Sequence, residues 1–148
     1  MAKKLSAPKT DAWDWFSKWV RVKDCLETTG FPFVGECVTC GRRFHISFLQ
    51  AGHCFPGRKN ARLFQEELVH AQCRFCNEGK HGCPTKYRKI MEKRYTPKEV
   101  EKWEIEGKRF IHDRDMDFEG IAKKYKDKLD KLLRGCGYYS YEELLGNR

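Results

Sequence analysis

The amino-acid sequence predicts an α+β fold that is mostly helical and is organised around four cysteines. Two Cys-x-x-Cys pairs, at residues 37–40 and 73–76, enclose a stretch with short runs of alternating polar and apolar residues. Before and after this stretch, apolar residues recur at helical spacing. A period of two indicates strands, and a period of 3.6 indicates helices. At 148 residues the chain suits one domain, with a small core flanked by N-terminal and C-terminal helices.

The paired cysteines predict a structural zinc site. Each pair presents two thiolates, and two pairs complete the tetrahedron that Zn²⁺ prefers. The sequence begins without the apolar run of a signal peptide, and no stretch is apolar enough to span a bilayer. We therefore expect a cytoplasmic protein with no membrane partner, whose thiols are reduced or metal-bound. The expected zinc ligands are Cys37, Cys40, Cys73 and Cys76.

The N-terminal part is expected to be a basic arm followed by a helix. Residues 1–10 contain several lysines and are predicted to be flexible. Residues 11–29 are predicted to form an amphipathic helix that ends before Gly30, with large aromatic side chains packed on the zinc core. The apolar positions at helical spacing are Trp15, Phe16, Trp19 and Val20.

Residues 30–95 are expected to form the zinc-bound core. After the first cysteine pair, the run R-F-H-I-S-F-L-Q predicts a half-buried strand, with His53 at its end. The next segment, 54–65, contains proline, glycine and asparagine, so it is predicted to be a loop.

A second strand, at 68–71, is predicted to lead into the second cysteine pair and a helix that begins near Arg74. Asn77 falls in the first turn of this helix, where its side chain can face the loop that carries His53. Glycines and a proline at residues 79–84 are expected to divide the helical pattern into two pieces.

Residues 96–148 are predicted to form the C-terminal helical region. Thr96-Pro97-Lys98-Glu99 has the form of a capping box with proline at the first helical position. An apolar stripe from Phe118 to Leu133 predicts a longer helix. Ser140-Tyr141-Glu142-Glu143 repeats the capping pattern and predicts a short final helix.

The positive charge is concentrated around the zinc motif. Residues 37–95 hold 12 Lys and Arg against 4 Glu and no Asp, so this segment carries +8 of the formal +9 of the chain. A basic surface fits a polyanionic partner, because each neutralised phosphate releases counterions. A merely solvated lysine-rich surface is the alternative, but the position of the charge favours DNA.

The order of these motifs resembles the ββα-metal (His-Me finger, or HNH) nucleases, in which two short strands and a helix hold one catalytic metal. Between residues 14 and 95, the runs F-S-K-W-V-R-V-K-D, C-V-T-C-G, A-G-H-C-F, R-L-F and V-H-A-Q-C-R-F-C-N, and the later Y-R, are similar to those of the phage NinG (Rap) recombination endonucleases. This resemblance implies a metal-dependent endonuclease that cuts branched DNA, such as D-loops and Holliday junctions, in the bacterial host. The knuckle-plus-asparagine arrangement is also similar to phage endonuclease VII, another junction resolvase.

The resemblance implies a role for each site residue. His53 is the expected general base, because neutral imidazole accepts a proton near neutral pH. Asn77 is the expected ligand of a catalytic Mg²⁺ or Mn²⁺, and His70 is expected to ligate or orient a metal. Arg58 and Arg62 are expected to clamp phosphates. The full set of expected DNA-binding residues is Arg58, Lys59, Arg62, Arg74, Lys80 and Arg88.

The sequence departs from the nuclease pattern at two positions. Gly52 stands where many HNH enzymes have a metal-binding acid, and no aspartate lies between residues 24 and 113. Few protein ligands then hold the metal, which suits a hard ion that keeps several waters. Leu68 stands where many have an asparagine that orients the histidine, so Asn60 or a backbone carbonyl is expected to take that part.

Three functions compete at this level. The first is a structure-selective DNA endonuclease, and the second is a zinc module that binds DNA without cutting it. The third is an HNH nickase that acts on linear duplex. A thiol nucleophile at Cys54 is the poorer chemical alternative, since no triad partner accompanies it. Homodimers are expected if the substrate is a symmetric junction, which offers two equivalent strands.

Overall fold

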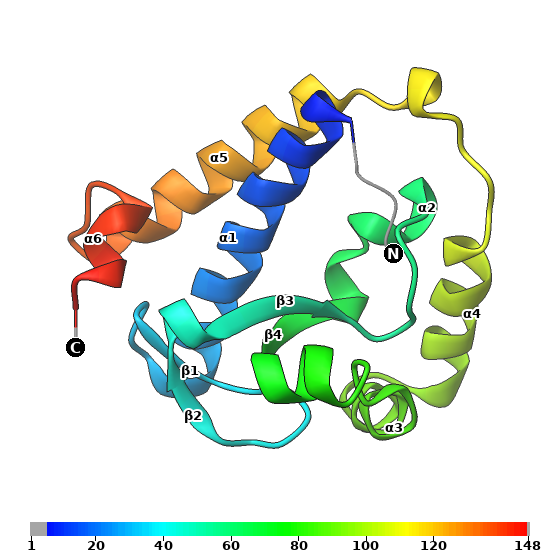
Figure 1. Cartoon of the computed structure of the whole chain (residues 1–148), viewed down its shortest axis with the longest axis horizontal. Coiled ribbons are helices and arrows are strands. Elements are labelled where there is room, and N and C mark those ends of the chain that lie inside the picture. Colours follow the sequence, from blue (N-terminus) through cyan, green and yellow to red (C-terminus); the bar gives the residue numbers. More distant parts are fainter. Residues whose placement is uncertain (1–5, 148) are drawn as a thin grey trace.

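A computed structural model describes residues 6–147 and shows small sheets packed against helices (Figure 1). The α+β, mostly helical class is therefore confirmed. In chain order the elements are α1 (Ala7–Thr29), β1 (Val34–Glu36), β2 (Arg43–His45), β3 (Leu49–His53), α2 (Asn60–Leu63), β4 (Val69–Cys73), α3 (Pro84–Arg94), α4 (Pro97–Gly107), α5 (Phe118–Gly135) and α6 (Tyr141–Leu145).

Helix α1 is the long element on which the core is built. It begins at Ala7, four residues before the expected start, because Pro8 sits in its first turn, where no backbone N–H is needed. The expected basic arm is therefore helical from Ala7, and its residues 1–5 lie outside the described residues. The helix ends as expected at Gly30, whose φ of 80° few other residues adopt without strain. Phe16 and Val20 are completely buried on its inner face.

The strands form two separate antiparallel pairs. β1 pairs with β2, and β3 pairs with β4 so that Gly52 lies opposite His70. The single strand expected at 43–50 is wrong, because a 3₁₀ turn at Ile46–Phe48 divides it into β2 and β3. The ring Nδ1 of His45 accepts a hydrogen bond from the backbone N–H of Ser47 at 3.2 Å, which stabilises this turn locally. His53 ends β3.

The connections on either side of β4 contain short helical segments. The expected loop at 54–65 contains the four-residue helix α2. The helix expected near Arg74 is a single π-helical turn, Phe75–Gly79, and it includes Asn77. After a break, α3 begins at Pro84, which confirms the division into two helical pieces.

The C-terminal helices begin where the sequence predicts. The side chain of Thr96 accepts a hydrogen bond from the N–H of Glu99 at 3.1 Å, which confirms this cap of α4. The cap predicted for α6 is wrong in detail, because Ser140 makes no capping hydrogen bond. Instead, the N–H of Tyr139 donates to Glu143 at 3.3 Å.

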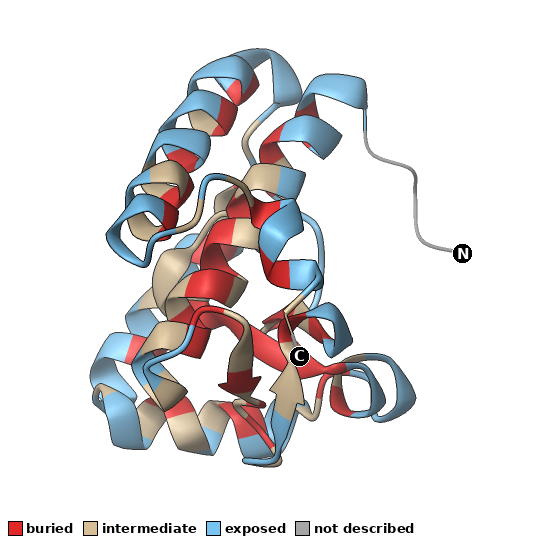
Figure 2. Cartoon of the chain, turned by 90° about the vertical axis from the view of Figure 1, so that its left-hand side faces the viewer, coloured by how far each residue is buried: buried red, intermediate tan, exposed pale blue. Residues whose placement is uncertain are grey.

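Two main groups of buried side chains hold these elements together. The larger one joins α1, both strand pairs, α5 and α6, and the smaller one lies between α3, α4 and the segment that joins β3 to β4. Figure 1 shows α1 and α5 side by side, and Figure 2 shows buried residues along the inner sides of the helices and along the strands. None of the described helices is long and apolar enough to cross a membrane.

Candidate functional site

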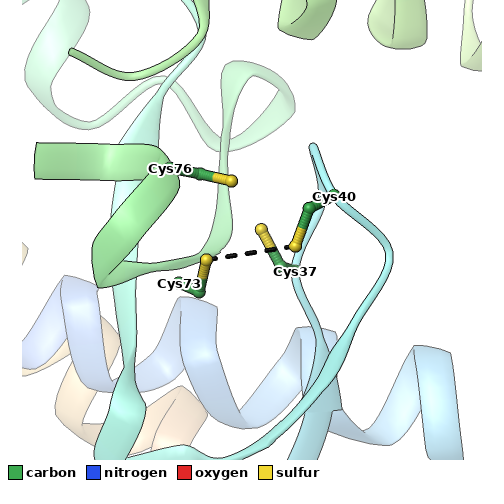
Figure 3. A group of neighbouring side chains, drawn as sticks. All are labelled: Cys37, Cys40, Cys73 and Cys76. Carbon is green, nitrogen blue, oxygen red and sulfur yellow. Dashed lines mark hydrogen bonds between the residues drawn. The ribbon is translucent and has the colours of Figure 1, made fainter. Parts of the chain in front are cut away.

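The four expected cysteines meet at one point (Figure 3). Their Sγ atoms all lie within 4.8 Å of one another, and those of Cys40 and Cys73 are 4.0 Å apart. A tetrahedral zinc site with Zn–S bonds of about 2.3 Å separates its sulfurs by roughly 3.8 Å. The cluster therefore has the chemistry and nearly the dimensions to bind a structural metal ion such as zinc.

The electrostatics of the cluster also fit a cation. Burial raises the pKa of the Cys37 thiol, but hydrogen bonds from Thr39 and nearby backbone N–H groups outweigh burial and lower the pKa to about 6. At Cys73, burial and the neighbouring thiols raise the pKa to about 12. A bound divalent ion offsets the repulsion between such thiolates.

A hollow of about 380 Å³ lies where β3 and the π-helical turn face α1. The polar side chains of His53, Asn77, Gln50, Glu78 and Arg58 line it. The structure thus brings together two of the three expected catalytic residues, His53 and Asn77, with one of the expected DNA-binding arginines. These groups come from β3, the loop before α2 and the turn after β4.

His53 is fixed from two sides. Its Nε2 lies 3.2 Å from the carbonyl oxygen of Leu63. A carbonyl can only accept, so Nε2 carries the proton and the lone pair resides on Nδ1. Trp13 stacks on the imidazole ring with centroids 5.1 Å apart. The sequence lacks the asparagine that orients the histidine in many HNH enzymes, and we expected Asn60 or a backbone carbonyl to replace it. The backbone carbonyl of Leu63 contacts His53. The side chain of Asn60 donates instead to Ile111 and Asp113.

The surroundings keep the imidazole neutral. Burial lowers the pKa of His53 from an ordinary 6.5 to about 4, the Leu63 hydrogen bond opposes this, and the charges of Arg58 and Arg62 add to the lowering. At physiological pH the ring therefore carries no charge, and a neutral ring has a lone pair that can accept a proton.

Asn77 is oriented through a chain of hydrogen bonds. Its Nδ2 donates to Oε1 of Gln50 at 2.8 Å, and Gln50 in turn donates to Glu78 at 2.9 Å. The other oxygen of Glu78 accepts from Nε of Arg74 at 2.8 Å. Within the described residues, Oδ1 of Asn77 accepts no hydrogen bond, so this oxygen can serve as a ligand.

Gly52 has no space for a side chain. An added Cβ would lie 2.1 Å from Oε1 of Gln72 and 3.1 Å from Oδ1 of Asn77. Gln72 is completely buried, and its amide donates to Thr39 and to the carbonyl of Gly82, both at 3.0 Å. A side-chain amide oxygen thus fills the space next to position 52, so an acidic residue there would clash with it.

His70 does not line the hollow of His53. Its Nδ1 lies 3.1 Å from a carboxylate oxygen of Asp24 in α1, and its Nε2 lies 3.0 Å from the carbonyl of Glu67. The same carboxylate accepts the N–H of Ala71 at 2.6 Å. Both ring nitrogens therefore point at oxygen acceptors within the protein, and the pair ties α1 to β4.

Asp24 stays ionised in this buried position. Burial alone raises its pKa, but the hydrogen bond and charge of His70, together with Lys23 at 2.6 Å, bring the pKa to about 2. The carboxylate is thus a charged structural group at neutral pH.

The side chains of the expected DNA-binding residues have different partners. Arg88 is engaged by Glu92 at 2.9 Å and by Glu104 at 3.1 Å. Arg62 donates to the carbonyl of Pro56. Arg74 pairs with Glu78, as described above. Lys80 lies over the ring of Phe75, 5.2 Å from its centre. Lys59 lines a second hollow, formed with α1 and the segment after α4.

Several site residues are absent from the sequence-based prediction. The burial of Asp24 could have been predicted, since this residue lies four positions after Val20 on the buried face of an amphipathic helix. The role of Trp13 could not be predicted from local sequence, because its contact with His53 joins residues 40 positions apart. The same holds for Gln72, whose position follows from the pairing of β3 with β4.

The sequence matches a known protein family. It matches a family model described as "NinG: Bacteriophage Lambda NinG protein" over residues 1–134. This match includes both cysteine pairs, the hollow around His53 and nearly all of α5. No curated protein and no solved structure gives a significant match.

Proposed function

We propose that this chain, which belongs to the bacteriophage lambda NinG family, is a metal-dependent endonuclease that cuts branched DNA during phage recombination in the bacterial host. Family membership supports a role related to recombination. The observation that carries the catalytic part is the neutral, oriented His53, which shares a hollow with Asn77 and Arg58.

The geometry supports a hydrolytic role for His53. Its Nε2–H is held by the Leu63 carbonyl, so Nδ1 is the atom that would accept a proton from an attacking water. The water oxygen would bond to phosphorus while the bond from phosphorus to the leaving 3′ oxygen breaks. That oxygen would take up a proton from solvent water, and the protonated His53 would return its proton to solvent. The guanidinium of Arg58 would hold a neighbouring phosphate oxygen.

The hollow offers few oxygen ligands for a catalytic ion. Within the described residues, the four cysteines are the only cluster of three or more His, Cys, Asp or Glu ligand atoms. Oδ1 of Asn77 is therefore the side-chain atom that we propose to hold Mg²⁺ or Mn²⁺, with Glu78 nearby. Such an ion, when bound, would supply a Lewis acid for the scissile phosphate.

We assign His70 a positioning role rather than a ligand role. Its hydrogen bonds to Asp24 and Glu67 fix the start of β4, the strand that pairs with the one ending in His53. Breaking this buried contact is costly, because it leaves the ionised carboxylate of Asp24 without one of its hydrogen-bond partners.

One observation favours a second candidate function. Gly52 lacks the acid that many HNH enzymes use, and its surroundings exclude one. A DNA-binding module without catalysis would tolerate this loss. The same basic surface and the same structural metal site would then serve binding alone, with one or two copies on a junction.

Substrate comparison tests the proposal. Purified protein is incubated with a four-way junction, a D-loop and a linear duplex of matched sequence, each with and without Mg²⁺ or Mn²⁺. The proposal expects metal-dependent cleavage of the two branched substrates in preference to the duplex. Equal cleavage of the linear duplex would favour a general nickase, and binding without cleavage under every ion would favour the binding module.

A further inference from the structure

A second hollow, separate from that of His53, gathers positive charge from three distant segments. It measures about 330 Å³ and lies between α1, the start of α2 and the segment that joins α4 to α5. In Figure 1 this segment runs from the end of α4 to the start of α5, close to the first turns of α1. The cations that line the hollow are Lys9, Lys59 and Arg109.

The walls of this hollow are held by polar contacts. Asn60 is buried, and its side-chain amide donates to the carbonyl of Ile111 and to the carboxylate of Asp113, both at 2.8 Å. Asp113 also pairs with Lys9 at 3.5 Å. These contacts fasten the segment after α4 to α1 and α2, so the hollow is a defined feature of the fold.

Two of the three cations have their charge available for a ligand. Asp113 offsets Lys9, whereas Lys59 and Arg109 are exposed and pair with no acid in the part of the chain that the structure describes. An anion in the hollow would meet both of them. A phosphodiester group is such an anion, and arginine binds its oxygens in a planar, bidentate manner.

An aromatic ring stands at the edge of the same hollow. Phe110 is 74% exposed, and its one ring partner among the described residues is His112, at 4.7 Å between ring centres. Cations beside an exposed aromatic ring are the combination with which proteins hold single-stranded nucleic acid, because the cations follow the backbone and the ring stacks on a base.

The second hollow adjoins the first along the chain. Arg58 lines the hollow of His53, and the next residue, Lys59, lines the second hollow. Helix α2 follows at once and ends at Leu63, whose carbonyl holds His53. A strand that passes Arg58 would therefore reach Lys59 within one residue of protein backbone, about 3.8 Å between Cα atoms.

We infer that the second hollow is a phosphate-binding subsite for the DNA strand that runs past His53, and that Phe110 stacks on a base of that strand that is unstacked from its neighbour. This inference rests on the proposed function, since it takes DNA as the ligand. It also gives a physical reason why the protein would prefer branched DNA to linear duplex. A continuous duplex has no unstacked base to offer to Phe110, whereas a strand at a branch point does.

Binding measurements without Mg²⁺ or Mn²⁺ test this inference independently of cleavage. The probes are a fluorescent four-way junction, a single strand and a linear duplex. The variants are Phe110→Ala and Arg109→Ala. Their matched controls are Tyr139→Ala, which removes a ring that is 89% exposed, and Arg134→Ala, at the opposite end of α5.

Phe110→Ala is expected to weaken binding of the junction and the single strand by about 5- to 150-fold, the range for loss of one stacked base. Duplex binding should change little. Arg109→Ala is expected to weaken binding of all three probes and to reduce the slope of log affinity against log salt by about 0.7–0.9, as for one lost phosphate contact.

Equal affinities of Phe110→Ala and Tyr139→Ala for all three probes would overturn the stacking role, and equal salt slopes of Arg109→Ala and Arg134→Ala would overturn the phosphate subsite. A wild-type protein that binds branched DNA but never cuts it would defeat the nuclease proposal while leaving this inference supported. A protein that cuts branched DNA, but whose Phe110 and Arg109 variants bind like their controls, would defeat only the inference.

Discussion

The indole of Trp13 lies nearly parallel to the imidazole of His53, with 18° between the ring planes and 5.1 Å between their centres. This contact joins the first turns of α1 to the last residue of β3. It covers one face of the imidazole, while the Leu63 carbonyl fixes the ring from its Nε2 edge. Helix α1 thus shields the proposed base through Trp13, and the carbonyl of Leu63 in α2 orients it.

Replacing Trp13 should raise the pKa of His53. Burial is the main cause of the lowered pKa of about 4, so Trp13→Leu, which lets water reach one face of the ring, should move the pKa upward toward 6.5. An NMR titration of the imidazole C–H signals measures this shift. Trp15→Leu, on the same helix, is the control and should leave the value near 4. An unchanged pKa in Trp13→Leu would show that the stacking does not desolvate His53.

His53 should also make the fold less stable as the pH falls. Its folded pKa of about 4 lies below the ordinary 6.5, so below pH 6.5 the unfolded chain binds a proton that the folded chain does not. Stability is therefore expected to fall between pH 6.5 and pH 4, by about 1–3 kcal/mol at pH 4.5. The stability that Asp24 contributes is lost below this window, as the pH falls from its ordinary pKa of 3.8 to the folded pKa of about 2.

Urea unfolding of wild type and His53→Gln at pH 7 and pH 4.5 measures this effect. The variant lacks the titrating group, so its loss of stability over the interval should be smaller by that amount. If both proteins lose the same stability, burial does not lower the pKa of His53 in the folded chain.

Gly52→Ala should destabilise the protein. The new methyl group would lie 2.1 Å from the buried Oε1 of Gln72, and neither the paired strands nor the bound amide can move away freely. Overpacking of this kind costs about 1–3 kcal/mol. Gly135→Ala is the control, because a Cβ there meets no atom within 4 Å. Equal midpoints of thermal unfolding for Gly52→Ala and wild type would contradict the close packing around Gly52.

Local signals in the sequence predicted much of this fold. The cap at Thr96, the end of α1 at Gly30 and the break before Pro84 depend on a few neighbouring residues, and the structure confirms all three. The turn at Ile46–Phe48 was not predicted, because its apolar residues resemble those of a strand and the contact between His45 and Ser47 decides the outcome.

Less of the site than of the fold could be predicted from the sequence. The cysteine pairs repeat a known spacing, so their convergence could be predicted. The partners of the histidines could not, since His53 meets Trp13 and His70 meets Asp24 across 40 and 46 positions of sequence. Such contacts follow from how α1 packs against β3 and β4, which no short motif encodes.

The cysteine cluster should hold one zinc ion per chain. Metal bound only by the folded chain adds directly to its stability, so Cys73→Ser should lose zinc and unfold at a lower temperature. Cys136→Ser is the control, because Cys136 is exposed and lies outside the cluster. Metal analysis of freshly purified, folded protein checks the stoichiometry. Folded wild-type protein without zinc would contradict this prediction.

The cleavage rate of His53→Ala on a four-way junction tests the central claim most directly. The measurement is made in single turnover with Mg²⁺, alongside zinc analysis and a binding constant for the same junction. Loss of a general base typically slows a reaction by about 10²–10⁴, so the variant should show that loss while its zinc content and its affinity stay near the wild-type values. A variant that cuts the junction at the wild-type rate would contradict the assignment of His53 as the base.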